Sequence, residues 1–222
     1  MLVNFSVFVA ESVQANDFYE GRTDGFAANE VLKIQQVRTS YKIVLDRNHL
    51  ARAISDARAG DFQALHISAH GDDRGISLSD GDFVTWLDLA GLLIRFGGIP
   101  NKAKKILIVS SCMGGYVGLS KALEKRGVAF RFIFGSTANA GVGFTHSCLA
   151  WSILYNRFVE LGRSRFDRAE LRNTLDKINQ VVSGDFVYRR WNGSVYLRYP
   201  GFATQPNKRP RRRTRNFRRS LS

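Results

Sequence analysis

The chain has 222 residues, of which 44% are hydrophobic and 23% charged, so it is long enough for one globular domain with a substantial core. The formal net charge is +14, but eight Lys or Arg and no acid lie between Gly201 and Ser222, which leaves +6 for the first 200 residues. Two cysteines exclude a disulfide framework and favour a reducing compartment. No run approaches the roughly 18 apolar residues of a membrane span. We therefore expect a cytoplasmic protein that does not bind membranes.

The hydrophobic pattern predicts strands that alternate with helices. Runs rich in β-branched and aromatic residues predict strands over residues 2–10, 41–45, 62–68, 105–110 and 129–134. Two hairpins are expected over 76–85 and 186–199, the second turning at Asn192-Gly193. Apolar spacings of three and four predict helices over 25–35, 46–60, 86–96, 116–126, 144–161 and 167–182. This alternation favours an α/β fold with a mostly parallel sheet covered on both faces.

The helical patterns also predict which side chains face the core. The inward residues expected in 25–35 are Phe26, Val31 and Ile34. Asp46 or Asn48 can cap the next helix, in which we expect Leu50, Ala53, Ile54 and Ala57 to face inward. In 86–96 we expect Leu87, Ala90, Leu93 and Ile94 to face inward, and in 116–126 Leu119, Ala122 and Leu123. The long helix over 144–161 is expected to bury Cys148, Trp151, Leu154, Tyr155 and Phe158. Residues 1–200 are thus predicted to form one domain, and 201–222 a basic, disordered tail.

Two consecutive core strands each end in a turn that carries one reactive side chain. The first reads Ala64-Leu-His-Ile-Ser-Ala-His70-Gly71, and the second Lys105-Ile-Leu-Ile-Val-Ser110-Ser-Cys112-Met-Gly-Gly115. Right-handed crossovers place the carboxyl ends of parallel strands at one edge of the sheet, where α/β proteins bind ligands. His70 and Cys112 are therefore expected at the same edge.

A thiol and an imidazole at one edge predict nucleophilic catalysis. Amides at the start of the helix that follows Cys112 would favour its thiolate, and His70 would carry the proton to the leaving amine. The amides of Gly71 and Cys112 would stabilise an oxyanion, while Gly114 and Gly115 leave room for a peptide. Taken singly, a cysteine at such a turn is more often an inert small hydrophobe; the pairing with a histidine raises the odds of catalysis.

Metal or cofactor chemistry is not expected. His66 and His70 share a face of their strand, but no acidic or thiol partner accompanies them at metal-ligand spacing. The chain contains neither a Walker sequence nor a complete dinucleotide fingerprint.

The two motifs resemble those of caspase-like cysteine peptidases. Ser68-Ala69-His70-Gly71 is similar to the family's His-Gly motif, and Ser110-Ser111-Cys112-Met113-Gly114 to its small-residue-Cys-x-Gly motif. The segment from Cys148 to Gly162 resembles a helix of the CHAT-type branch. The resemblance spans about residues 1–200 and implies a three-layer caspase-like fold. It also implies His70 as general acid and base, Cys112 as nucleophile, and the amides of Gly71 and Cys112 as oxyanion hole.

The residues that set specificity depart from the familiar subfamilies. Two positions before the cysteine, metacaspase-like enzymes carry an Asp that selects basic residues and caspases a Gln that helps to accept Asp, whereas this chain has Ser110. Neither specificity transfers. Other residues considered for substrate binding are Asp72 and Asp73, as an acidic rim, and Ser136 and Thr137, which follow the fifth strand.

The sequence thus predicts a cysteine endopeptidase with a His-Cys dyad that cleaves a peptide or protein substrate, in the manner of a regulated or defence-related protease. The alternative is a catalytically idle α/β module that binds a protein or nucleic acid through the same edge or through its tail. The arginines of Lys208–Arg219 suit nucleic acid or another polyanion.

Overall fold

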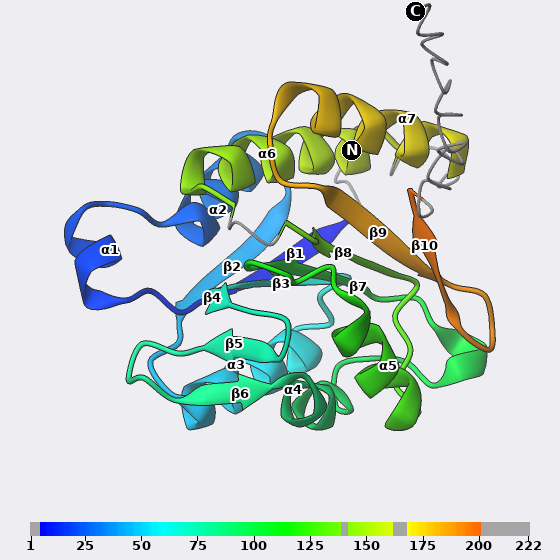
Figure 1. Cartoon of the computed structure of the whole chain (residues 1–222), viewed down its shortest axis with the longest axis horizontal. Helices are drawn as coiled ribbons and strands as arrows, with labels where there is room; N and C mark the ends of the chain where they lie inside the picture. Colours follow the sequence, from blue (N-terminus) through cyan, green and yellow to red (C-terminus); the bar gives the residue numbers. More distant parts are fainter. Residues whose placement is uncertain (1–4, 139–141, 162–167, 201–222) are drawn as a thin grey trace, which may run out of the picture.

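A seven-stranded sheet forms the centre of the protein (Figure 1). The computed structural model describes residues 5–138, 142–161 and 168–200. The strand order is β10-β9-β8-β7-β3-β1-β2. The parallel strands are β1 (Ser6–Glu11), β2 (Arg38–Ile43), β3 (Ala64–Ser68), β7 (Ile106–Ser110) and β8 (Phe132–Ser136). The hairpin of β9 (Phe186–Trp191) and β10 (Tyr196–Tyr199) extends the sheet antiparallel to β8.

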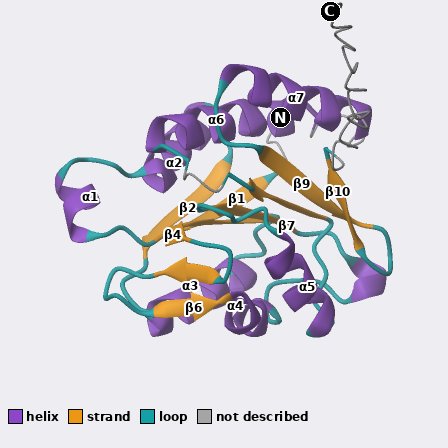
Figure 2. Ribbon diagram, viewed as in Figure 1, coloured by secondary structure: helices purple, strands orange, loops and turns teal. Residues whose placement is uncertain are grey.

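Helices cover both faces of this sheet, which confirms the expected three-layer α/β architecture (Figures 1 and 2). One face carries α2 (Asp24–Ile34), α6 (Phe144–Leu161) and α7 (Arg168–Val181), and the other carries α3 (Arg47–Ala59), α4 (Trp86–Leu93) and α5 (Val117–Lys125). Each face has its own apolar core. Because both faces are covered, β1, β3, β7 and β8 are buried along their whole length, which explains their nearly continuous apolar sequence.

The remaining elements lie around the ends of the strands. A five-residue helix, α1 (Ala15–Tyr19), follows β1. A small antiparallel sheet of β4 (His70–Gly71), β5 (Gly75–Ser77) and β6 (Phe83–Thr85) follows β3, and a short 3-10 helix (Pro100–Lys102) precedes β7. The expected hairpin over 76–85 is therefore present, with β4 as an additional strand.

Several helix patterns were predicted correctly. Asp46 caps α3 by accepting a hydrogen bond from the amide of His49, and the four predicted inward residues of α3 are buried. The predicted inward residues of α5 are buried as well. In α6 four of the five predicted residues are buried, and the fifth, Cys148, is only half-buried.

The predicted face of α2 was wrong, and that of α4 was half right, since Ala90 and Leu93 are buried as expected. In α2 the side chains of Phe26 and Ile34 are exposed, whereas Ala28 and Leu32 pack against the sheet. In α4 Leu87 and Ile94 are exposed, and Trp86 and Leu89 are buried in their place. Both helices carry apolar residues around much of their circumference, so spacing alone does not select the buried side.

Some boundaries differ from those expected, and one helix was not foreseen. β2 begins at Arg38 rather than at residue 41, because it pairs with β1 from Ser6 onward. β8 covers 132–136 rather than 129–134; Ala129 instead bridges to Gly98. The short helix α1 lies outside the helix predicted over 25–35. The expected tail at 201–222 lies outside the described residues.

Candidate active site

The carboxyl ends of β1, β3 and β7 are level with one another. Glu11 on β1 is the register partner of Ser68 on β3, which is in turn the partner of Ser110 on β7. His70 and Cys112 each follow their strand's paired serine by two residues, so they project from the same height of the sheet. The chain crosses to β2 over one face and from β3 to β7 over the other, which makes the β1–β3 boundary the switch point where α/β folds open a crevice.

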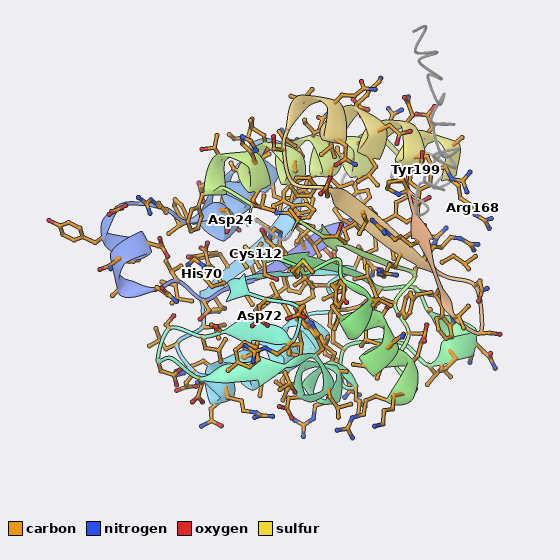
Figure 3. The ribbon with its side chains drawn as sticks, in the orientation of Figure 1. Asp24, His70, Asp72, Cys112, Arg168 and Tyr199 are labelled. Carbon is orange, nitrogen blue, oxygen red and sulfur yellow. The ribbon has the colours of Figure 1, made fainter. Side chains whose placement is uncertain are left out.

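A cavity opens at this edge, and both His70 and Cys112 line it. Figure 3 shows His70, Cys112 and Asp24 near one another at this end of the sheet. The described residues that line it are Glu11, Ser12, Val13, Asp17, Arg22, Asp24, Ser68, Ala69, His70, Ser110, Ser111, Cys112, Val142, Phe144 and Ser147. The wall therefore comes from the ends of three strands, from the segment between β1 and α2, and from the start of α6.

Cys112 lies in a sharp turn between β7 and α5. Met113 has a left-handed φ of 61°, and the amide of Gly114 donates to the carbonyl of Ser111 at 3.1 Å. A Cβ at Gly114 would lie 2.4 Å from the Val109 carbonyl oxygen, and one at Gly115 2.7 Å from that of Gly135. These glycines are required because the turn packs against the backbone of β7 and β8. This close packing explains Gly114 and Gly115 without the room for a peptide that the sequence suggested.

Gly71 adjoins the cysteine turn. A Cβ at Gly71 would lie 3.2 Å from the Ser111 side chain and 2.7 Å from the Gly75 carbonyl oxygen. The amide of Asp72 donates to that same carbonyl at 3.0 Å. Successive amides of an extended strand point to opposite sides, so the Gly71 N–H faces away from β5.

His70 has a buried carboxylate as its partner. Its Nε2 lies 2.6 Å from Oδ2 of Asp17 on α1, and since a carboxylate only accepts, Nε2–H is the donor. The Asp17 side chain is 10% exposed and also faces Arg22, whose guanidinium is 3.5 Å from Oδ1. The ring of Phe144, from α6, packs edge-on against the imidazole. Asp17 and Phe144 thus fix the position of the imidazole ring.

Asp24 lies at the floor of the cavity and joins the two strand ends. Its two carboxylate oxygens accept hydrogen bonds from the hydroxyls of Ser68 and Ser110. The Ser110 hydroxyl in turn accepts from the indole Nε1 of Trp151 on α6 at 2.6 Å. Burial raises the pKa of Asp24, and the serine hydrogen bonds oppose that shift. Ser110, which was considered for substrate binding, lines the cavity and holds the Asp24 carboxylate in place by its hydrogen bond.

Glu11 is the second acid of the floor, and it also organises α2. Its carboxylate accepts from the amides of Gly25 and Phe26 in the first turn of α2, at 2.8 and 2.9 Å, and from the hydroxyl of Tyr41 at 2.7 Å. Burial raises the pKa of Glu11, the Tyr41 hydrogen bond lowers it, and the charge of Asp24 raises it further. Two buried carboxylates therefore stand side by side next to Cys112 and His70.

The other residues considered for substrate binding lie outside this cavity lining. The Asp72 carboxylate folds back on its own loop, where it accepts from the backbone amides of Arg74 and Gly75 and from the Arg74 guanidinium. The side-chain hydrogen bond with Arg74 lowers the pKa of Asp72. Asp73 is exposed, and its carbonyl accepts from Trp86. Figure 3 shows Asp72 beside the small sheet.

Ser136 and Thr137, at the end of β8, connect the cysteine turn to the segment before β9. The Ser136 carbonyl accepts from the amide of Gly115 at 2.7 Å, and its hydroxyl donates to Gly184. Thr137 bonds the carbonyl of Asp185 through its amide and its hydroxyl. Both residues therefore tie the end of β8 to the turn before β9.

Sequence reasoning missed the three acids Glu11, Asp17 and Asp24. One signal was available: all three follow or end the first strand, so the same edge rule that placed His70 and Cys112 brings them near. Their exact partners depend on α1, for which the sequence shows no clear pattern. Within the described residues, no three His, Cys, Asp or Glu side chains are grouped so as to hold a metal ion. His66 is wholly buried, and its Nδ1 shares a 2.5 Å hydrogen bond with the Tyr155 hydroxyl.

The helices of the described segments include none that is both long and apolar enough to cross a bilayer. Cys112 and Cys148 are both free thiols. The tail at Lys208–Arg219, considered for polyanion binding, lies outside the described residues, as does the proposed domain boundary at residue 200–201.

Neither a protein-family model nor a curated protein matches the sequence. Among solved structures, the fold is similar to the X-ray structure of an inactive zymogen C11 protease from Parabacteroides distasonis, with a TM-score of 0.52 and 12% sequence identity. The match covers 86% of this chain but only 62% of that protease, so this chain spans less than two thirds of its length. The similarity establishes a caspase-like fold.

Proposed function

We propose that this protein is a cysteine endopeptidase in which Cys112 attacks a peptide carbonyl and His70 moves the proton. The observation that carries the proposal is that both side chains line one cavity, each two residues beyond the paired ends of the adjacent parallel strands β3 and β7. The caspase-like fold supports it, because the motifs that resemble those of caspase-like peptidases fall at this edge. The proposal extends to a reducing compartment such as the cytoplasm, where both thiols remain free.

The reaction follows from the groups at the cavity. The Cys112 thiol passes its proton to Nδ1 of His70, since Nε2 is occupied by Asp17. The thiolate forms a C–S bond with the substrate carbonyl, whose oxygen takes up the π electrons as an oxyanion. Collapse breaks the C–N bond, and the imidazolium gives its proton to the leaving amine. Water, deprotonated by His70, then hydrolyses the thioester and restores the thiol.

Two amides are suited to the oxyanion. The Gly71 N–H faces away from β5, and a Cβ added at Gly71 would lie 3.2 Å from the side chain of Ser111, the residue before Cys112. The Gly71 and Cys112 amides are therefore the proposed oxyanion donors. Preorganised donors of this kind contribute about 3–4 kcal/mol each to catalysis.

The charges that line the cavity favour some substrate side chains over others. Among the described residues, its lining holds the acids Glu11, Asp17 and Asp24 and one cation, Arg22, whose side chain is half-exposed. A substrate carboxylate placed here would meet buried like charges, whereas an ammonium or guanidinium group would favour the ionised acids. We therefore propose that the enzyme rejects acidic residues before the scissile bond and cleaves more readily after neutral or basic ones.

The test is covalent labelling with a peptidyl acyloxymethyl ketone, followed by intact-mass analysis and mapping of the adduct. A single adduct on Cys112 that is lost in His70→Ala supports the dyad. Cys148→Ala is the matched control, because burial raises the pKa of the Cys148 thiol and keeps it protonated. An unreactive Cys112 in freshly reduced protein would contradict the proposal and favour an idle binding module.

A further inference from the structure

We infer that Asp17 is a positioning residue that completes a Cys112–His70–Asp17 triad. This inference rests on the proposed function, and it adds to it a residue that neither motif contains. The motifs supply only the cysteine and the histidine, whereas Asp17 comes from α1, between β1 and α2.

The geometry is that of a carboxylate holding a catalytic imidazole. Asp17 Oδ2 and His70 Nε2 are 2.6 Å apart, within the range of charge-assisted hydrogen bonds. With Nε2–H donated to Asp17, Nδ1 carries the lone pair that can accept the thiol proton. The carboxylate also lowers the energy of the imidazolium that forms when Cys112 is deprotonated. Asp17 therefore sets both the tautomer and the charge balance of the pair.

The local structure holds Asp17 in this position. Its carbonyl accepts from the amide of Arg22 at 2.7 Å, which closes the loop after α1. The Arg22 guanidinium contacts the free oxygen, Oδ1, and is held on its other side by Glu20. By contrast, the neighbouring side chains of α1, Phe18 and Tyr19, are 64% and 92% exposed. Of these three successive residues, only Asp17 turns its side chain into the protein.

Other charged groups also face the pair. Arg22 lies on the far side of the Asp17 carboxylate, and Glu11 and Asp24 line the same cavity from the end of β1 and the start of α2. From α6, the groups that line the cavity are the uncharged Phe144 and Ser147. The effect of Asp17 must therefore be separated from that of the general negative potential.

The experiment measures the alkylation rate of Cys112 by iodoacetamide as a function of pH, in a Cys148→Ala background. Iodoacetamide is small and neutral, so its rate reports the thiolate without any contribution from substrate binding. We expect Asp17→Asn to move the rate–pH curve to higher pH and to lower kcat for a peptide substrate about 10²-fold or more. Glu30→Gln removes the same charge from the exposed side of α2, where the carboxylate pairs with Lys33, and is expected to leave the curve unchanged.

Two further measurements separate positioning from a purely structural role. Melting temperatures show whether the variants are folded, and Asp17→Glu, which keeps the carboxylate, is expected to retain the wild-type curve at reduced kcat. A curve for Asp17→Asn that overlays the wild-type one would overturn the inference, whatever its melting temperature. If instead the Cys112 thiol of the wild-type protein is not alkylated by the peptidyl ketone, with loss of the reagent's carboxylate, the proposed function fails, and that result is distinct from failure of the triad.

Discussion

Gly135 on β8 supports the cysteine turn through a very close backbone contact. A Cβ added there would lie 2.4 Å from the amide nitrogen of Gly115 and 2.5 Å from the carbonyl carbon of Gly114. Gly135 itself is paired with Val109 on β7 and with Val187 on β9. Because strands on both sides hold β8 in place, a substitution of Gly135 by Ala must displace the turn that carries Cys112.

The contact distances set the size of the effect. Ordinary contacts begin near 3.4 Å, so the turn must move by about 1 Å. A displacement of that size at a nucleophile costs about 10²-fold in kcat/KM. Overpacking of this kind costs about 1–3 kcal/mol of folding free energy. For a chain of this length that corresponds to a fall in melting temperature of about 2–12 °C.

The assay compares peptide cleavage and thermal unfolding of Gly135→Ala with those of Gly91→Ala. Gly91 lies in α4, and the nearest atom to a Cβ there is the end of the Arg126 side chain at 4.0 Å. Gly91→Ala is therefore expected to keep full activity and to gain up to about 1 kcal/mol of stability from helix propensity. If Gly135→Ala matched wild type in both measurements, the close packing of the turn would not be what positions Cys112.

Three further predictions concern the acids and thiols. In the pH range around 7, iodoacetamide is expected to modify Cys112 well before Cys148, whose pKa burial raises; equal rates in intact-mass time courses would argue against this. Peptides with Arg or Lys before the scissile bond should be cleaved at least about tenfold faster than those with Asp, and a library profile led by Asp would refute the charge argument. Burial raises the pKa of Asp24 above its unfolded value, so the folded state binds more protons and loses stability as pH rises through that pKa. Urea unfolding should therefore show the stability of Asp24→Asn improving relative to wild type as pH rises from about 4; a constant difference would contradict the assignment.

The order of strands and helices could be predicted from the sequence because the sheet is buried on both faces. Long apolar runs such as 105–110 have few alternatives to a central strand, and the crossover rule then fixes their direction. The buried face of α2 could not be predicted, because Phe26 and Ile34 compete with Ala28 and Leu32 for the core.

The candidate site was predictable only in the part that local motifs encode. His70 and Cys112 follow strands whose ends are in register, so their placement follows from topology. The acids depend instead on contacts between distant segments: Asp17 reaches His70 across 53 positions and Asp24 reaches Ser110 across 86. Asp72 and Asp73 closely follow His70 in the sequence, yet neither lines the cavity, and the Asp72 carboxylate is hydrogen-bonded to Arg74 instead. Proximity in sequence was therefore a poor guide to the cavity wall.

Hydrolysis of a peptide bond tests the central claim most directly. A peptide library incubated with the reduced protein in H₂¹⁸O should yield fragments whose new carboxyl termini carry one ¹⁸O, as deacylation by water requires. These fragments should be absent with Cys112→Ala at equal concentration and equal melting temperature. If the wild-type protein produced no such fragments, or the Cys112→Ala protein produced them at the same rate, Cys112 would not be the nucleophile of a peptidase.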